Sequence, residues 1–227
     1  MSETAIGHVF LSNLFHRFPK KVGLIVTSIA ERSPDMSARQ DSLSEPKSSM
    51  FFRELAACGV FEIRIDRRED ERGFFARTWC KNDFQQHGLN SNLVQCSVSF
   101  NTRRGTLRGM HYQLQPYAEA KLVRCTQGAV YDVVLDLRPD SPTFRNWVST
   151  VLTADEHNML YVPEGCAHGF LTLEDSTELF YQMSNIYSPE AARGVRWNDP
   201  AFGIIWPSDV TVISERDRAY PNFISPR

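Results

Sequence analysis

Three features are missing from this 227-residue sequence: an excess of charge of one sign, a long apolar run and paired cysteine motifs. The 25 basic and 27 acidic residues nearly balance, so no overall field draws the chain to nucleic acid or to an anionic membrane. No apolar stretch approaches the roughly 18 residues that a membrane-spanning helix needs. Residues 22–30 follow basic residues as in a signal peptide, but they begin late and are interrupted by Thr27 and Ser28. We therefore expect neither a nucleic-acid partner nor a membrane partner.

The five cysteines are odd in number, scattered, and never spaced as Cys-x-x-Cys. A disulfide framework uses an even set of cysteines, most often in a short secreted chain. Scattered single thiols are typical of a reducing compartment, where cysteine packs as a small apolar side chain. The pattern predicts a cytoplasmic protein without a disulfide framework.

The first 49 residues differ in composition from the rest. Residues 31–49 are largely serine, proline and charged residues, which cannot build a packed core. An apolar run begins abruptly at Met50. We expect residues 1–49 to be a disordered extension outside the core, either a functional segment or the product of an upstream start codon. Residues 50–227 are expected to form one domain.

Long helical periodicity is nearly absent, and short alternating runs take its place. In residues 129–137, Tyr131 and Val133 alternate with Val130 and Asp132, which is the period of a strand with two different faces. Further strands are expected at 61–65, 92–100, 106–113, 121–125, 147–152, 158–162, 168–173 and 178–184. Many short strands at close spacing predict an all-β sandwich or barrel, which can hold a pocket in its mouth.

Two connections can also be predicted. Thr-Gln-Gly at 126–128 is a turn signal, so strands 121–125 and 129–137 are expected to form a hairpin. Residues 80–88 are expected to hold one short helix, with Asn82 or Asp83 near its start and Gly88 after its end.

His111 lies in the segment GTLRGMHYQ, residues 105–113. On a regular strand Leu107, Gly109 and Gln113 share its face and Arg108 faces the other way. A bulge at Gly109 would re-aim one of these side chains. Three roles are open for this histidine: a core residue, a metal ligand and a catalytic base.

A second histidine, His168, follows the turn residues Pro163 and Gly165 on another expected strand. Two strand histidines in a small barrel suggest a metal site, but a cupin-type site needs His-x-His on the first strand. Gln113 stands where the second of these histidines belongs, and no nearby Cys/His cluster replaces it. We therefore expect no metal.

Three more polar residues carry weak signals when each is taken alone. Lys121 opens a strand, where it is either a solvated edge residue or a barrel cation that requires an anion. Core packing accounts for Tyr181, and Asp217 lies among charges near the C-terminus, as surface residues do. Composition and spacing alone thus predict an all-β barrel with a polar pocket and no particular activity.

The order of the motifs goes further than the chemistry of single residues. The sequence contains, in this order, DERGFFARTW, GTLRGMHYQ, KLVRCTQGAVYDVVLDLRPDSPTFRNW, YVPEGCAHGFLTLED, ELFYQMSNIYSPE, RGVRWNDPAFGIIWP and ISERDRAYP. Over residues 55–222 it resembles the dTDP-4-dehydrorhamnose 3,5-epimerase family. The resemblance implies a cupin-like β jelly roll, a double-stranded β-helix barrel with a few short helices, in a homodimer that uses no metal or other cofactor.

The same resemblance implies an isomerase of deoxysugar biosynthesis. Its substrate is a nucleotide-linked 4-keto-6-deoxy sugar, whose C4 ketone acidifies the protons on C3 and C5. By resemblance, His111 is the base, Asp217 its partner, Tyr181 the acid on the far face and Lys121 the cation beside the enolate oxygen. The implied binding residues are Gln95, Ser97, Arg108 and His168, together with Arg72 and Phe75, which the partner subunit lends.

The sequence departs from the family pattern near the nucleotide and the sugar. Cys96 and Ser97 stand where the family has x-Asn after a glutamine, Arg77 stands where it often has glutamate, and Ile186 replaces one tyrosine of a pair. These departures leave open a 3- or 5-mono-epimerase and a CDP-linked substrate. Two further functions also stay open: a metal-dependent cupin enzyme that uses His111 and His168, and a non-catalytic sugar-nucleotide binding module.

Overall fold

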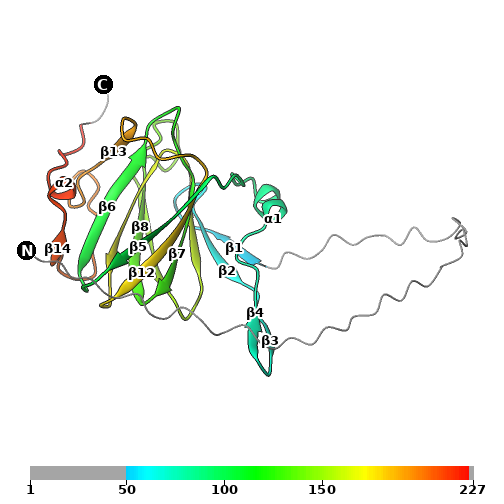
Figure 1. Cartoon of the computed structure of the whole chain (residues 1–227). Helices are drawn as coiled ribbons and strands as arrows, with labels where there is room; N and C mark the ends of the chain where they lie inside the picture. The colour runs from blue at the N-terminus through cyan, green and yellow to red at the C-terminus, as the bar shows by residue number, and fades with distance from the viewer. Residues whose placement is uncertain (1–49, 225–227) are drawn as a thin grey trace, which may run out of the picture. The chain divides into compact units, whose positions relative to one another are not determined.

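The computed structural model of the protein describes residues 50–224, and the extension expected at residues 1–49 lies outside them. Two antiparallel sheets face each other across the domain (Figure 1). The first contains, in spatial order, β1 (Met50–Glu54), β2 (Phe61–Ile65), β10 (Met159–Val162), β7 (Lys121–Gln127), β12 (Thr177–Met183) and β5 (Gln95–Asn101). The second contains β13 (Ala192–Gly194), β6 (Thr106–Gln113), β11 (Cys166–Thr172), β8 (Ala129–Asp136) and β9 (Trp147–Thr153). These facing sheets confirm the predicted all-β sandwich.

Smaller elements complete the described part of the chain. A short strand, β14 (Val212–Ile213), runs parallel to β6, and the helix α2 (Glu215–Arg218) follows it. The hairpin of β3 (Arg68–Asp70) and β4 (Gly73–Phe75) stands apart from both sheets in Figure 1. The predicted helix is confirmed as α1 (Lys81–Gln86), with Cys80 as its N-cap and with Asn82 and Asp83 near its start, as expected. Within this range no helix is long and apolar enough to cross a membrane.

The two faces of β8 show how the alternating pattern builds the core. Val130 and Val134 point between the sheets, where they join Val123 and Cys125 of β7 in one buried cluster. Val133 and Leu135 point the other way and pack under residues 195–223, which cover the outer face of the second sheet. Both faces of β8 are therefore buried, and the C-terminal segment is held against the sheet that carries His111.

The prediction that residues 121–125 and 129–137 form a hairpin is wrong. β7 pairs with β10 and β12 in the first sheet, whereas β8 pairs with β11 and β9 in the second. The turn at Gly128, whose φ is 74°, passes the chain from one sheet to the other. Because the apolar faces of both strands fill the same core, the strands lie across the core from each other rather than side by side.

Candidate active site

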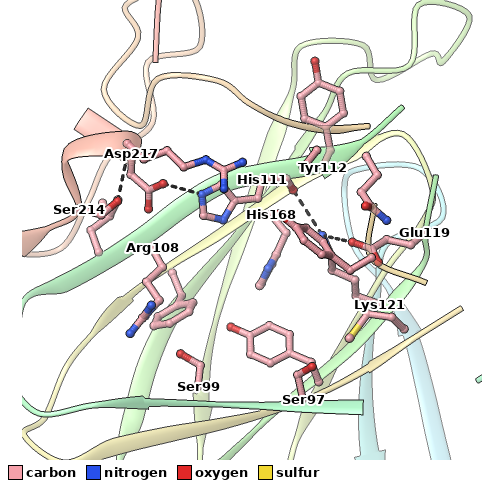
Figure 2. Close-up of a pocket in the computed structure, with 18 of the residues that line it drawn as sticks. Ser97, Ser99, Arg108, His111, Tyr112, Glu119, Lys121, His168, Ser214 and Asp217 are labelled. Atoms are coloured by element: carbon pink, nitrogen blue, oxygen red, sulfur yellow. Dashed lines mark hydrogen bonds and ion pairs between the residues drawn. The ribbon is translucent and has the colours of Figure 1, made fainter. Parts of the chain in front are cut away.

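A cavity of about 830 Å³ opens between the two sheets. Its walls come from β5, β6, β7, β11 and β12 and from the segment around α2. The structure brings eight of the ten predicted site residues to this cavity: Gln95, Ser97, Arg108, His111, Lys121, His168, Tyr181 and Asp217. Figure 2 shows His111 and Asp217 on one side and Ser97 and Ser99 on the other.

A bulge in β6 aims the side chains of both Arg108 and His111 into the cavity. His111 pairs with His168 of β11, but Arg108 pairs with Phe170, so two residues of β6, Gly109 and Met110, oppose the single residue Gly169 of β11. Gly109, which lies in the bulge, has a φ of 149° that favours glycine. The regular alternation is thus interrupted, and the predicted bulge at Gly109 is confirmed. Arg108 and His111 consequently line the same cavity.

His111 forms a hydrogen-bonded pair with Asp217. Its Nε2 lies 2.7 Å from Asp217 Oδ1, while the other carboxylate oxygen accepts the N–H of Gly109 at 3.2 Å. Ser214 caps α2 by accepting the N–H of Asp217 at 3.0 Å, which fixes the position of the aspartate. A carboxylate only accepts, so Nε2 carries the proton and Nδ1 remains as the basic nitrogen.

Burial and hydrogen bonding act on Asp217 in opposite directions. Burial raises its pKa, but the hydrogen bonds and charge of His111 and the donors Gly109 and Ser214 outweigh that effect and hold the pKa below its usual value. Asp217 is 4% exposed, so the surface position suggested by composition is wrong. The resemblance, which depends on the order of motifs and not on composition, implied that Asp217 is the partner of His111, and the structure brings the two side chains within 2.7 Å.

Lys121 is a buried cation with an acidic partner. Its Nζ lies 3.2 Å from Glu119 Oε1 and 3.5 Å from the carbonyl oxygen of His111. Glu119 was not predicted from the sequence, although its place two residues before the lysine on a short extended segment is a weak signal. The pair holds the ammonium group beside the strand that carries His111 (Figure 2).

His168 and Tyr181 form another part of the cavity wall. The Nε2 of His168 lies 2.7 Å from Asp132 Oδ1, and its ring makes an edge contact with the ring of Tyr181 at a centroid distance of 6.0 Å. Burial, followed by the charge of Asp132, raises the pKa of Tyr181 well above its usual value. Tyr181 therefore stays protonated at neutral pH and can act as a proton donor.

Two predicted binding residues lie on β5, opposite His111. Ser97 faces the cavity, and Gln95 accepts the backbone N–H of Tyr187 through its Oε1 at 2.9 Å. Tyr187 also lines the cavity, so Gln95 ties the loop after β12 to this wall.

The cavity carries an excess of positive charge. Arg108, Arg193 and Arg216 line it, and none of them has a carboxylate within ion-pair distance among residues 50–224. The two acidic groups of the wall, Glu119 and Asp217, are already paired. Arg193 and Arg216 were not predicted, because arginine is common on surfaces and neither lies in a spacing pattern that marks a site. The surplus charge suits an anionic ligand.

Arg72 and Phe75 are the two predicted residues that do not reach the cavity of their own chain. They belong to the β3–β4 hairpin, where the side chain of Arg72 is 84% exposed and pairs with Asp70, and Phe75 is 74% exposed. Their exposure on a projecting hairpin leaves them available to a second molecule.

The histidines of the cavity are each bonded to a carboxylate. Gln113, which stands at the position of the second cupin histidine, hydrogen-bonds to the neighbouring loops. Its amide NH₂ donates to the carbonyl oxygens of Tyr117 and Ile186, and its amide oxygen accepts the N–H of Ser188. Among residues 50–224 no three His, Cys, Asp or Glu side chains converge in a metal-binding arrangement.

Fold and site together define a cupin-like jelly-roll enzyme whose cavity holds a group that can accept a proton, His111, and a group that can donate one, Tyr181. The sequence model of the dTDP-4-dehydrorhamnose 3,5-epimerase family matches residues 54–225, and the chain belongs to that family of isomerases. It is 42% identical over 174 residues to the dTDP-4-dehydrorhamnose 3,5-epimerase of Sinorhizobium fredii (strain NBRC 101917 / NGR234), a match that covers 76% of this chain and 89% of that protein.

Solved structures show the same fold. The dTDP-4-dehydrorhamnose 3,5-epimerase of Bacillus anthracis str. Ames, with TDP and PPi bound, is 39% identical, with a TM-score of 0.74 over 77% of this chain and 99% of that one. ChmJ, a 3'-monoepimerase from Streptomyces bikiniensis in complex with dTDP-quinovose, is 33% identical, with a TM-score of 0.69 over 74% and 85% of the two chains. The predicted family and jelly-roll fold are thereby confirmed.

Proposed function

We propose that this protein inverts C3 and C5 of a dTDP-linked 4-keto-6-deoxy sugar by removing a proton from one face of the ring and returning one to the other. The observation that carries this proposal is the His111–Asp217 pair, 2.7 Å apart in a cavity that also holds Tyr181. The family membership supplies the reaction, and the nucleotides bound by the relatives supply the substrate class.

The first step uses the basic nitrogen of His111. Nδ1 takes the proton from a carbon next to the ketone, the C–H electrons form a carbon–carbon double bond, and negative charge develops on the C4 oxygen. Asp217 fixes the tautomer of His111 and stabilises the imidazolium that forms. Lys121, held by Glu119, is placed to stabilise the enolate oxygen, a contact worth several kcal/mol of the barrier.

The second step uses Tyr181 as the acid. Its O–H bond breaks, a C–H bond forms on the opposite face of the ring, and the ketone returns. Because burial and Asp132 keep the phenol protonated, the donor is ready in the resting enzyme. Water then resets the protonation of the tyrosine and the histidine.

The nucleotide diphosphate accounts for the surplus positive charge. Arg108 is held by its Nε–H bond to Asn101 Oδ1 at 2.8 Å and by a longer bond from Nη2 to the carbonyl oxygen of Phe100 at 3.5 Å. Its other N–H donors are left for phosphate oxygens. His168, Gln95 and Ser97 complete the binding wall. No further cofactor enters these steps.

We also propose a homodimer in which each hairpin serves the partner's cavity. Arg72 and Phe75 lie outside the cavity of their own chain, and their side chains are largely exposed. A guanidinium group and an aromatic ring suit the phosphate and base of a nucleotide. The expected cytoplasmic location stays a prediction.

A mono-epimerase acting on the same or a CDP-linked sugar is the second candidate. Arg77 and Ser97, which differ from the family pattern, motivate it, and ChmJ is a 3'-monoepimerase with this fold. Incubating the enzyme in deuterated water with dTDP- and CDP-linked 4-keto-6-deoxyglucose separates the candidates by NMR. Deuterium at C3 and C5 of the dTDP sugar, with inversion at both, supports the main proposal. Inversion at one centre, or only with CDP, supports the second candidate, and inversion with neither nucleotide contradicts both.

A further inference from the structure

Behind the cavity wall lies a buried acid that the steps above leave without a direct role. Asp132 on β8 is fully buried. Its Oδ1 accepts from His168 Nε2 at 2.7 Å, and its Oδ2 has no hydrogen-bond partner among the described residues. Burying a carboxylate is costly unless a partner compensates it, and His168 is the side chain that does so here.

The His168–Asp132 pair has the same hydrogen-bond geometry as the pair of His111 and Asp217. His168 and His111 are direct neighbours across β11 and β6, and each donates Nε2–H to an aspartate at 2.7 Å. The carboxylate of Asp132 fixes the tautomer of His168, so Nδ1 is the nitrogen left for the cavity. No hydrogen bond within residues 50–224 occupies that nitrogen.

The two pairs differ in their aromatic neighbours. The ring of His168 meets Tyr181 of the opposite sheet edge-on, at a centroid distance of 6.0 Å and an interplanar angle of 76°. His111 instead meets Tyr220 of the C-terminal segment, at 6.1 Å. The His168–Asp132 pair therefore adjoins the proton donor. The charge of Asp132 also helps to raise the pKa of Tyr181, after the larger effect of burial.

We propose that Asp132 is a positioning residue for the acid side of the reaction, as Asp217 is for the base side. Asp132 holds the imidazole of His168 so that Nδ1 contacts the sugar beside Tyr181, which keeps the enolate in line for protonation by the phenol. This inference rests on the proposed epimerase function. It predicts that losing Asp132 impairs inversion while proton abstraction by His111 continues.

The test compares two rates in deuterated water with the dTDP-linked keto sugar. Exchange into recovered substrate reports abstraction by His111, and product formation reports delivery by Tyr181. For Asp132→Asn we expect inversion to fall about 100-fold, the effect of a misplaced reacting group, while exchange stays close to the wild-type rate. Tyr181→Phe should give the same signature, whereas Asp217→Asn should lower both rates.

A double-mutant cycle distinguishes positioning from general support of the fold. In a His168→Gln background, Asp132→Asn should cost no further inversion, because it acts through the histidine. If Asp132→Asn does not fold, as judged by circular dichroism, the ratio of inversion to exchange is measured for His168→Gln instead, and this ratio should fall relative to that of the wild-type protein. An unchanged ratio of the two rates, or additive losses in the cycle, overturns the inference. Absence of both rates in the wild-type protein would instead overturn the proposed function.

Discussion

At the residue scale, Asp217 fixes the tautomer and the ring orientation of His111. Its two carboxylate oxygens are used by different donors, the imidazole of His111 and the backbone N–H of Gly109. The ring can therefore neither rotate nor change tautomer without breaking its hydrogen bond to Asp217. This constraint leaves Nδ1 as the nitrogen that is available for the proposed proton abstraction.

Replacing Asp217 by asparagine tests that control. The amide can donate as well as accept, so the imidazole is no longer held in one tautomer, and we expect turnover to fall about 100- to 10,000-fold. Steady-state kinetics measure the loss. Asp199→Asn is a matched control, because Asp199 is also buried and accepts backbone N–H groups, but lies outside the cavity. Equal losses of turnover in the two folded variants would contradict the assigned role.

The lowered pKa of Asp217 also predicts a dependence of stability on pH. A carboxyl group with a lower pKa in the folded state stabilises the fold above its unfolded pKa, and this contribution is lost as the pH falls through the folded value. The wild-type protein should therefore exceed Asp217→Asn in unfolding free energy at neutral pH, and the difference should narrow below about pH 4. Urea unfolding at several pH values measures it, and a difference that widens in acid would contradict the assignment.

At the element scale, the bulge in β6 aims Arg108 and His111 at one cavity. Gly109 can adopt the required φ of 149°, and it passes so close to β11 that an added Cβ would lie 2.6 Å from the Cα of Gly169. The bulge also presents the N–H of Gly109 to Asp217. Two glycines on neighbouring strands, Gly109 and Gly169, thus set the geometry of the His111–Asp217 pair.

Gly109→Ala should remove this geometry. The methyl group meets backbone and requires an unfavourable φ, so we expect a loss of about 1–3 kcal/mol in unfolding free energy and of about 100-fold in turnover. Gly88→Ala is the control, because Gly88 has a φ of 70° but no neighbour within 4 Å of an added Cβ. It should lose stability without losing turnover. Wild-type turnover in Gly109→Ala would show that the bulge does not position His111.

How much the sequence predicts also differs between kinds of element. The strands can be predicted because residues for two different faces alternate along segments such as residues 129–137, whose two faces pack into two different hydrophobic clusters. The pairing of the strands could not be predicted from the sequence, because the turn at Gly128 has the residues of a hairpin turn but connects strands of two different sheets. Local residues define a turn, whereas the shared core decides which strands pair.

The site shows the same division. One short segment, residues 105–113, identifies His111 as a candidate and predicts the bulge at Gly109. Because Gln113 stands where a cupin-type metal site has its second histidine, the same segment also argues against such a site. Asp132 and Glu119 could not be identified, because buried pairing with His168 and Lys121 is a property of the folded chain.

At the scale of the whole molecule, the described chain presents a cavity and a hairpin that do not meet. The hairpin carries two exposed phenylalanines, Phe74 and Phe75, at 44% and 74% exposure. In the proposed homodimer, each complete site combines the cavity of one subunit with Arg72 and Phe75 of its partner. The proposed shared site accounts for the exposed positions of Arg72 and Phe75, the two implied binding residues that lie outside the cavity of their own chain.

Mixing two inactive variants tests the shared site. Subunits of Arg72→Ala and His111→Asn, exchanged under mild denaturation, should form heterodimers with one intact site, so about a quarter of all sites should recover. Mixing Arg72→Ala with Phe75→Ala is the control, because both changes lie on the same hairpin and leave no intact site. Failure of the first mixture to recover turnover would contradict the shared site.

The central claim is that the imidazole of His111 removes a carbon-bound proton next to the ketone. The most direct measurement is deuterium incorporation by wild-type protein and His111→Asn, each in deuterated water with the dTDP-linked 4-keto-6-deoxy sugar. The account predicts deuterium at C3 and C5 with the wild-type protein, and none above the uncatalysed rate with a folded His111→Asn. Incorporation by His111→Asn at the wild-type rate would show that another group is the base.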